Sequence, residues 1–185
     1  MDTSILPQPN RHWMMSKPWR LFAFGFGSGL SSIGPGTVGT LWAWAVGLIF
    51  QSFFAEYTKS DGFILLTLGF LLGCWACGKC GEELGKPDHS GMVWDEIIAF
   101  WLVLLLILPS SWKIQTLGFI AFRIFDIAKP GPIRWVDAYF KTWNGEGFFG
   151  KWPSLFRGFG VMIDDLIAAF FTLVVISVFI KLGMH

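Results

Sequence analysis

Residues 166–180 read LIAAFFTLVVISVFI, and this stretch carries no charged side chain. Asp164 and Asp165 stand just before it, and Lys181 stands just after it. A helix needs about 20 mostly apolar residues to cross the roughly 30 Å hydrocarbon core of a bilayer. Further charge-free runs occupy residues 21–55, 62–78 and 97–112. We therefore expect a chain built from membrane-spanning helices.

The composition indicates a lipid environment. Of the 185 residues, 54% are hydrophobic and only 15% are charged, and the mean hydropathy is +0.56. A water-soluble domain spends about a quarter of its residues on charge. The formal net charge of +1, the 20 Phe and the 11 Trp exclude a disordered chain, a basic nucleic-acid-binding protein and a disulfide scaffold as first interpretations.

Glycine, proline and charged residues define the bounds of the predicted spans. Glycines and Pro35 break the first run, so residues 38–54 are predicted as its span and residues 21–37 as a hinged, Gly-rich approach. Residues 114–129 form a further crossing with a charged end at the interface. The sequence predicts an all-α, polytopic membrane helical bundle of about four to five transmembrane helices. Its expected parts are a polar cytoplasmic N-terminus (1–20), a single membrane-embedded domain (21–185) and, within that domain, an enlarged cytoplasmic loop (138–157).

The basic residues set the expected orientation. With five crossings, Lys59, Lys113 and Lys181 fall on one side of the membrane, and the other 11 of the 14 Lys and Arg fall on the opposite side. Short loops rich in Lys and Arg face the cytoplasm. The polar loops, and any site that they form, are therefore predicted on the cytoplasmic side.

Charged residues gather at the predicted inner ends of the spans. Asp95-Glu96 opens the third span, Arg123-x-x-Asp126-x-x-Lys129 closes the fourth, Arg134-x-x-Asp137 follows it, and Asp164-Asp165 opens the fifth. On a continuing helix, the i, i+3 spacing from Arg123 through Asp126 to Lys129 would form one ridge. Clustered carboxylates repel one another without cations, and hard ions such as Mg²⁺ prefer oxygen ligands. The cationic side chains suit a phosphate. The pattern predicts a site for Mg²⁺ and phosphate.

Simpler interpretations of these residues remain open. An acid in the first turn of a helix can act as a cap, although the second acid of each pair is not needed for that purpose. Arg123 and Asp126 could form a purely structural ion pair.

Three weaker motifs have alternatives of their own. The string GPGTVGT at 34–40 could present backbone N–H groups to phosphate, or it could be a hinge or a close helix contact. His89 lies in the polar loop before Asp95, where it could be an acid, a base, a group near a bound metal ion or simply a solvated side chain. Cys74, Cys77 and Cys80 are interpreted as reduced packing residues rather than as a redox or metal motif.

Taken together, these residues resemble the phosphatidylglycerophosphatase A family of bacterial inner-membrane lipid phosphatases. The matching strings are GSGL at 27–30, PGT at 35–37, VWDE at 93–96, FRIFD at 122–126, KP at 129–130, PIR at 132–134 and GFGVMIDD at 158–165. Two features depart from the family pattern: Arg157 replaces an expected glycine, and the 138–157 loop is longer than expected. The resemblance implies Mg²⁺-dependent removal of the terminal phosphate from phosphatidylglycerophosphate, which leaves phosphatidylglycerol.

Both lines of reasoning assign roles to the same residues. The carboxylates expected to hold one or two Mg²⁺ ions are Asp95, Glu96, Asp164 and Asp165. The other catalytic candidates are Arg123, Asp126 and Lys129. The substrate-binding candidates are Arg134, Ser28, Thr37 and His89. The expected partners are the lipid substrate and the inner-membrane bilayer, and nucleic acid is not expected. The alternative is a small ion-coupled transporter that uses the same interfacial acids as a cation site.

Overall fold

A computed structural model of the protein describes residues 7–53, 58–143 and 148–183, and every regular element in these ranges is helical. This confirms the predicted all-α class. The elements in chain order are α1 (Arg11–Met15), α2 (Pro18–Ala23), the 3₁₀ segment η1 (Gly25–Leu30), α3 (Pro35–Phe53), α4 (Lys59–Glu83), α5 (Trp94–Ile107), α6 (Trp112–Ala128), α7 (Pro132–Thr142), the 3₁₀ turn η2 (Phe148–Lys151) and α8 (Pro153–Lys181).

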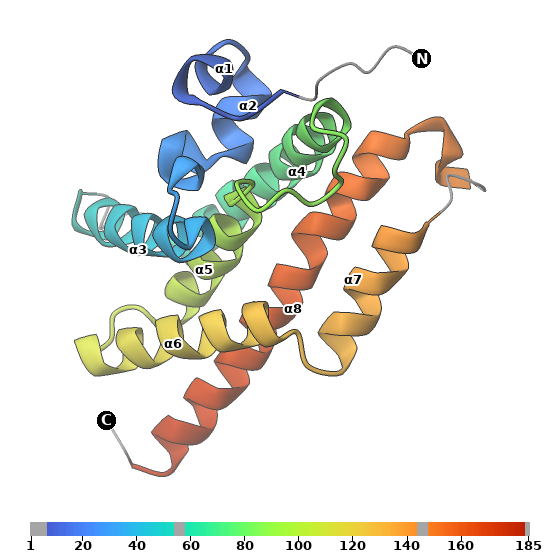
Figure 1. Cartoon of the computed structure of the whole chain (residues 1–185). Helices are drawn as coiled ribbons and strands as arrows, with labels where there is room; N and C mark the ends of the chain where they lie inside the picture. Colours follow the sequence, from blue (N-terminus) through green and yellow to red (C-terminus); the bar gives the residue numbers. More distant parts are fainter. Residues whose placement is uncertain (1–6, 54–57, 144–147, 184–185) are drawn as a thin grey trace, which may run out of the picture.

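The longest helix, α8, organises the bundle. It crosses the whole molecule in Figure 1, and α4, α5, α6 and α7 all pack against it. Small residues let α4 and α8 approach closely: a β-carbon on Gly78 would strike the carbonyl of Ser154, and one on Gly158 would strike the carbonyl of Cys74. Close backbone contact at small residues is a common way for helices to associate in a membrane.

Three tryptophan side chains connect the remaining helices. The indole N–H of Trp94 donates to the carbonyl of Gly69 at 2.9 Å, which joins α5 to α4. The indole of Trp101 donates to the carbonyl of Ala43 at 2.8 Å and joins α5 to α3. The indole of Trp44 donates to Gln115 Oε1 at 2.8 Å and joins α3 to α6. These bonds satisfy indole N–H groups that would otherwise be costly in an apolar interior.

Two helices in the described part of the chain, α4 and α8, are long and apolar enough to cross a membrane. Both expose large apolar side chains along their length, as lipid-facing helices do, including Ile64, Leu68, Phe170 and Val178. Helices α5 and α6 have 14 and 17 residues, which correspond to about 21 and 26 Å of helix. The number of four to five transmembrane helices stays a prediction.

Several predicted boundaries differ from the structure. Asp164 and Asp165 do not open a helix, because α8 already begins at Pro153. The prediction failed because the polar residues before the apolar run are part of the same helix and pack against α4 and α7. The third predicted span was placed too late, since α5 ends at Ile107 and Trp112 already belongs to α6. The segment 138–157 is not one enlarged loop: α7 continues to Thr142, and η2 and α8 follow, while residues 144–147 lie outside the described ranges.

The Gly-rich segment predicted as a hinge is packed in place. Gly25, Phe26 and Gly27 all have positive φ angles, which turns the chain sharply between α2 and α3. A β-carbon on Gly29 would strike the carbonyl of Gly91, and the N–H of Val93 donates to the carbonyl of Ala23 at 2.9 Å. The segment therefore fixes the loop that leads into α5.

The N-terminal helices are attached to the end of α4. Lys17 Nζ lies 3.0 Å from Glu83 Oε1, and Arg20 Nε lies 2.6 Å from Glu83 Oε2. The guanidinium of Arg20 also stacks over the Trp13 ring at 4.3 Å. Residues 7–20 are thus an ordered part of the bundle, and the predicted polar segment 1–20 lies outside the described ranges only at residues 1–6.

Candidate active site

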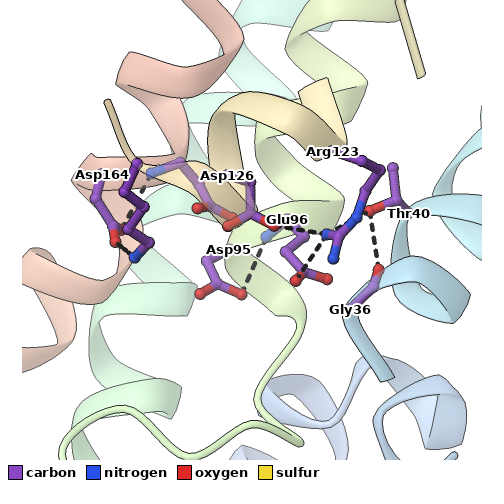
Figure 2. Close-up of polar contacts among 9 residues, drawn as sticks. Gly36, Thr40, Asp95, Glu96, Arg123, Asp126 and Asp164 are labelled. Atoms are coloured by element: carbon purple, nitrogen blue, oxygen red, sulfur yellow. Dashed lines mark hydrogen bonds and ion pairs between the residues drawn. The ribbon is translucent and has the colours of Figure 1, made fainter. Parts of the chain in front are cut away.

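Five carboxylates from three helices meet in the interior of the bundle. Asp95 and Glu96 stand in the first turn of α5, Asp126 stands near the end of α6, and Asp164 and Asp165 stand about three turns into α8. Asp164 and Asp165 expose only 3% and 2% of their surface. Asp165 lies within electrostatic reach of the other four acids. Figure 2 shows Asp164, Asp126 and Glu96 in one row beside Asp95.

Capping does not explain the pairs. Asp164 and Asp165 lie far inside α8, so neither has a helix N-terminus to cap. In α5, Asp95 Oδ1 accepts the N–H of Glu96 at 3.0 Å, which satisfies one free donor of the first turn. The carboxylate of Glu96 is directed elsewhere, into an ion pair with Arg123.

Arg123 joins three helices. Its Nη1 lies 3.0 Å from Glu96 Oε1 on α5 and 2.7 Å from Asp126 Oδ2 on its own helix. The same atom donates to Thr40 Oγ1 on α3 at 3.4 Å (Figure 2). Its Nε is buried and has no hydrogen-bond partner in the structure. The predicted ion pair between Arg123 and Asp126 is therefore present, and the guanidinium keeps a donor for a further acceptor.

Lys129 ends α6 in the left-handed conformation, with φ of 41°. The ridge expected from Arg123 to Lys129 therefore stops at Asp126, because the helix ends at Ala128. The turn directs the ammonium of Lys129 between Asp137 Oδ1, at 3.0 Å, and Asp164. Lys129 is a fixed positive charge at the α8 side of the cluster.

The first turn of α3 holds the carboxylate of Glu96. A β-carbon on Gly36 would clash with both carboxylate oxygens of Glu96, and one on Gly39 would come within 3.3 Å of Glu96 Oε2. Only a helix without side chains at these two positions can approach so closely. The GPGTVGT string therefore acts as a close contact with Glu96, one of the two structural alternatives that its sequence left open.

Two carboxylate oxygens in the cluster have no partner. Glu96 Oε2 and Asp165 Oδ2 are both buried and accept no hydrogen bond in the structure. A buried carboxylate oxygen without a donor is costly unless a cation or a water molecule satisfies it. Across the described ranges, no three His, Cys, Asp or Glu side chains are already arranged to hold a metal ion.

The predicted substrate-binding residues do not join the contacts of the cluster. Ser28 Oγ donates to the carbonyl of Gly25 at 2.8 Å within η1. His89 Nδ1 accepts the N–H of Gly91 at 3.0 Å in the loop before α5. Thr37 is partly buried in the first turn of α3, and Arg134 is exposed on the first turn of α7. Ser28 and His89 thus support the local backbone.

Three further residues shape the site, and the sequence pattern assigned no role to them. Thr40 contacts Arg123, Gly36 contacts Glu96, and Asp137 shares Lys129 with Asp164. The signal for Gly36 and Thr40 was present as an i, i+4 pair within the Gly-rich string, but their partners lie far away in sequence. Asp137 stood in a noted cluster without an assigned role.

The cysteine triplet lies buried in α4, in agreement with its interpretation as small packing residues. Cys74, Cys77 and Cys80 are all buried and free. The carbonyl of Cys74 faces Gly158 across the α4–α8 contact. Their place in the structure is that of small packing residues.

Comparisons with known proteins identify the family of the chain. The sequence profile of the family described as Phosphatidylglycerophosphatase A matches residues 21–180. Phosphatidylglycerophosphatase A of Escherichia coli (strain K12) is 38% identical over 154 residues, which cover 83% of this chain and 78% of that protein. The protein of the same name from Haemophilus influenzae is 37% identical over 169 residues, or 91% of this chain and 92% of that protein.

A third relative has a different name. The putative phosphatidylinositol-3-phosphatase of Bacteroides thetaiotaomicron is 33% identical over 164 residues, which cover 85% of this chain and 91% of that protein. No solved structure matches the chain significantly. The profile match includes every carboxylate of the cluster, and the two relatives that share the family's name each cover more than four fifths of the chain. The chain therefore belongs to the phosphatidylglycerophosphatase A family.

Proposed function

We propose that the chain is a membrane phosphatase that removes the terminal phosphate from phosphatidylglycerophosphate, with Mg²⁺ as its cofactor. The family and its named relatives support hydrolysis of this lipid phosphomonoester. One structural observation carries the proposal. The buried, unpartnered atoms Glu96 Oε2 and Asp165 Oδ2 lie in the same cluster as the buried, unpartnered donor Arg123 Nε.

The donor set of the cluster suits Mg²⁺. All its acidic side chains offer oxygen, the ligand that this ion prefers. Mg²⁺ in phosphate-transferring sites is commonly bound by one or two carboxylates together with water and substrate phosphate. A site without three preset ligands is therefore compatible with the ion. The residues that would hold it are Asp95, Glu96, Asp164 and Asp165.

The chain's own residues supply the rest of the chemistry. When bound, Mg²⁺ supplies charge neutralisation on the phosphate and activation of the attacking water. Arg123 offers its free Nε to a phosphate oxygen, and the guanidinium is held in place by Glu96 and Asp126. Lys129 adds a second positive charge at the opposite side of the cluster. Such positioning and charge stabilisation account for most catalysis of phosphoryl transfer.

A carboxylate without a partner can also receive a proton. As the water oxygen forms its bond to phosphorus, its proton would pass to whichever of Glu96 Oε2 and Asp165 Oδ2 does not bind the cation, since neither accepts a hydrogen bond in the structure. The bond between phosphorus and the glycerol oxygen breaks, and that oxygen takes up a proton from a solvent water, while the carboxylate releases the proton that it received, so that no proton is gained or lost overall. The products are phosphatidylglycerol and inorganic phosphate.

The bilayer holds the substrate beside the site. The acyl chains would lie against the exposed apolar faces of α4 and α8. The excess of Lys and Arg in the polar loops favours a multi-pass protein of the inner membrane with its site on the cytoplasmic side. The lipid then needs to expose only its head group.

A phosphate-release assay tests the substrate. The purified chain, in detergent with Mg²⁺, is given phosphatidylglycerophosphate or phosphatidylinositol 3-phosphate, the latter because of the name of the Bacteroides relative. We expect release from phosphatidylglycerophosphate at a much higher kcat/KM. Preferential release from the inositol lipid would contradict the proposed substrate. The transporter alternative predicts no release from either lipid.

A matched pair of variants tests the site. Asp165→Asn should lower kcat by about 100-fold or more, which corresponds to about 2.7 kcal/mol of transition-state stabilisation. The control is Asp61→Asn, because Asp61 is a partly exposed acid in the first turn of α4, where it bonds to Thr58 and has no contact with the acids of the cluster. Asp61→Asn should keep normal kcat. Equal activity of both variants would contradict the assigned role of Asp165.

A further inference from the structure

We propose that Thr40 is a positioning residue for Arg123. The uncharged hydroxyl of Thr40 fixes the guanidinium of Arg123 from the α3 side. The inference rests on the proposed function in one respect: Arg123 is taken to contact the phosphate. The contact itself does not depend on that function.

The Thr40 hydroxyl donates one hydrogen bond and accepts another. Thr40 is completely buried, and its Oγ1 donates to the carbonyl of Gly36 at 2.9 Å. A hydroxyl has one proton, so its oxygen is left with lone pairs only. Arg123 Nη1 donates to that oxygen at 3.4 Å, as Figure 2 shows. The chain of bonds runs from the first turn of α3 through Thr40 to α6.

The two other partners of Arg123 have a different character. Glu96 and Asp126 are carboxylates within the proposed metal cluster, so their orientation and charge balance change when a divalent cation arrives. Thr40 is uncharged, so its hydroxyl remains available to Arg123 with or without a bound cation. It therefore holds the guanidinium in place while the acids exchange partners. A guanidinium held only by acids would be free to follow them away from the phosphate.

A second buried threonine provides a matched control. Thr172 on α8 is also completely buried, and its Oγ1 also donates one turn back, to the carbonyl of Ala168 at 2.8 Å. No charged side chain among the described residues bonds to it. Thr40→Val and Thr172→Val therefore remove the same group from the same helical setting, and only the first removes a partner of Arg123.

The kinetic experiment compares four variants: Thr40→Val, Thr40→Ser, Thr172→Val and Thr172→Ser. We expect Thr40→Val to lower kcat for phosphate release by about tenfold or more, in line with the loss of a hydrogen bond to a charged group. Thr40→Ser should retain kcat within about twofold, as should both Thr172 variants. KM should change less than kcat. Thr40→Ala replaces Thr40→Val if the valine variant does not fold.

Several outcomes would overturn the inference. One is normal kcat in a folded variant without the hydroxyl. Another is a loss in Thr40→Ser as large as that in Thr40→Val, which would assign the effect to the methyl group. A third is an equal loss in Thr172→Val, which would make it a general cost of removing a buried hydroxyl.

A stability measurement separates this inference from the proposed function. The unfolding free energies of Thr40→Val, Arg123→Gln and the double variant form a cycle that needs no substrate. We expect the two single effects to be non-additive, because both substitutions remove the same contact. Additive effects would overturn the inference. If the wild-type chain releases no phosphate, the proposed function fails, and the cycle still decides whether Thr40 holds Arg123.

Discussion

Gly36 on α3 lies directly against the carboxylate of Glu96 on α5, so closely that a β-carbon at position 36 would clash with both carboxylate oxygens. The contact joins two helices whose sequence positions are far apart. It places the acid where Arg123 can reach it at 3.0 Å.

The first prediction is that Gly36→Ala separates activity from stability. Alanine favours a helix by about 1 kcal/mol over glycine. The flexible carboxylate of Glu96 can move away, so the fold should tolerate the change while kcat falls by about tenfold or more. The control is Gly118→Ala, since the new methyl group would meet only side-chain ends, those of Ile176 at 3.2 Å and of Ile107 and Val103 at 3.6 Å. Normal kcat in folded Gly36→Ala would argue against this role for the contact.

The second prediction concerns Lys129 and the cation. Lys129 neutralises Asp164, and removing one partner of a buried ion pair costs about 3 kcal/mol or more. Lys129→Met should therefore unfold at a lower temperature than the wild type in the absence of Mg²⁺. Adding Mg²⁺ should raise the unfolding temperature of the variant more than that of the wild type, because the ion no longer competes with the ammonium for Asp164. Equal shifts in the two proteins would contradict a shared site for Lys129 and Mg²⁺.

The third prediction follows from the protonation of His89. Burial, followed by the nearby Lys86, lowers the pKa of His89 below its ordinary value of 6.5. The folded state thus prefers the neutral ring, and its contribution to stability is present above pH 6.5 and is lost as the pH falls. On acidification from pH 7.5 to about pH 5.5, the unfolding temperature of the wild type should therefore fall relative to that of His89→Gln.

His89→Gln should show a weaker decrease over the same range, because the glutamine does not titrate. His12→Gln is the control, since His12 is exposed on α1. A slope in His89→Gln equal to that of the wild type would remove His89 as the cause.

The fourth prediction is that the cysteines have no chemical role. The variant with Cys74, Cys77 and Cys80 all changed to alanine should keep kcat within about twofold. Its stability should fall moderately, because small cavities form in the buried core around α4. By contrast, Gly158→Leu should prevent folding, since any β-carbon there meets the α4 backbone. Loss of activity in a folded triple variant would revive a thiol mechanism.

The sequence predicted the helical class and most of the helices because charge-free runs mark the segments that lipid or core can accept. It misplaced the start of α8, since that helix continues through Arg157, Asp164 and Asp165 to Pro153. Packing against α4 and α7 accommodates these polar residues, and a hydropathy pattern contains no information on such tertiary contacts. The number of residues in a charge-free run is therefore not the length of the helix.

The sequence predicted which residues belong to the site better than it predicted the contacts between them. The acids of the cluster could be identified because doublets of buried acids are unusual in an apolar chain. The role of Thr40 could not be identified, because Arg123 stands far from it in sequence and only the fold brings them together. Lys129 was expected on a helical ridge, and the left-handed turn at this residue directs it instead to Asp164 and Asp137.

The central claim is that the buried acids of α5 and α8 act through a divalent cation, and metal removal tests it most directly. Phosphate release from phosphatidylglycerophosphate by the purified wild-type chain is measured in Mg²⁺, after excess chelator, and after Mg²⁺ is added back. The account predicts that release stops with the chelator and returns with Mg²⁺. Undiminished release by the folded chain in excess chelator would contradict it.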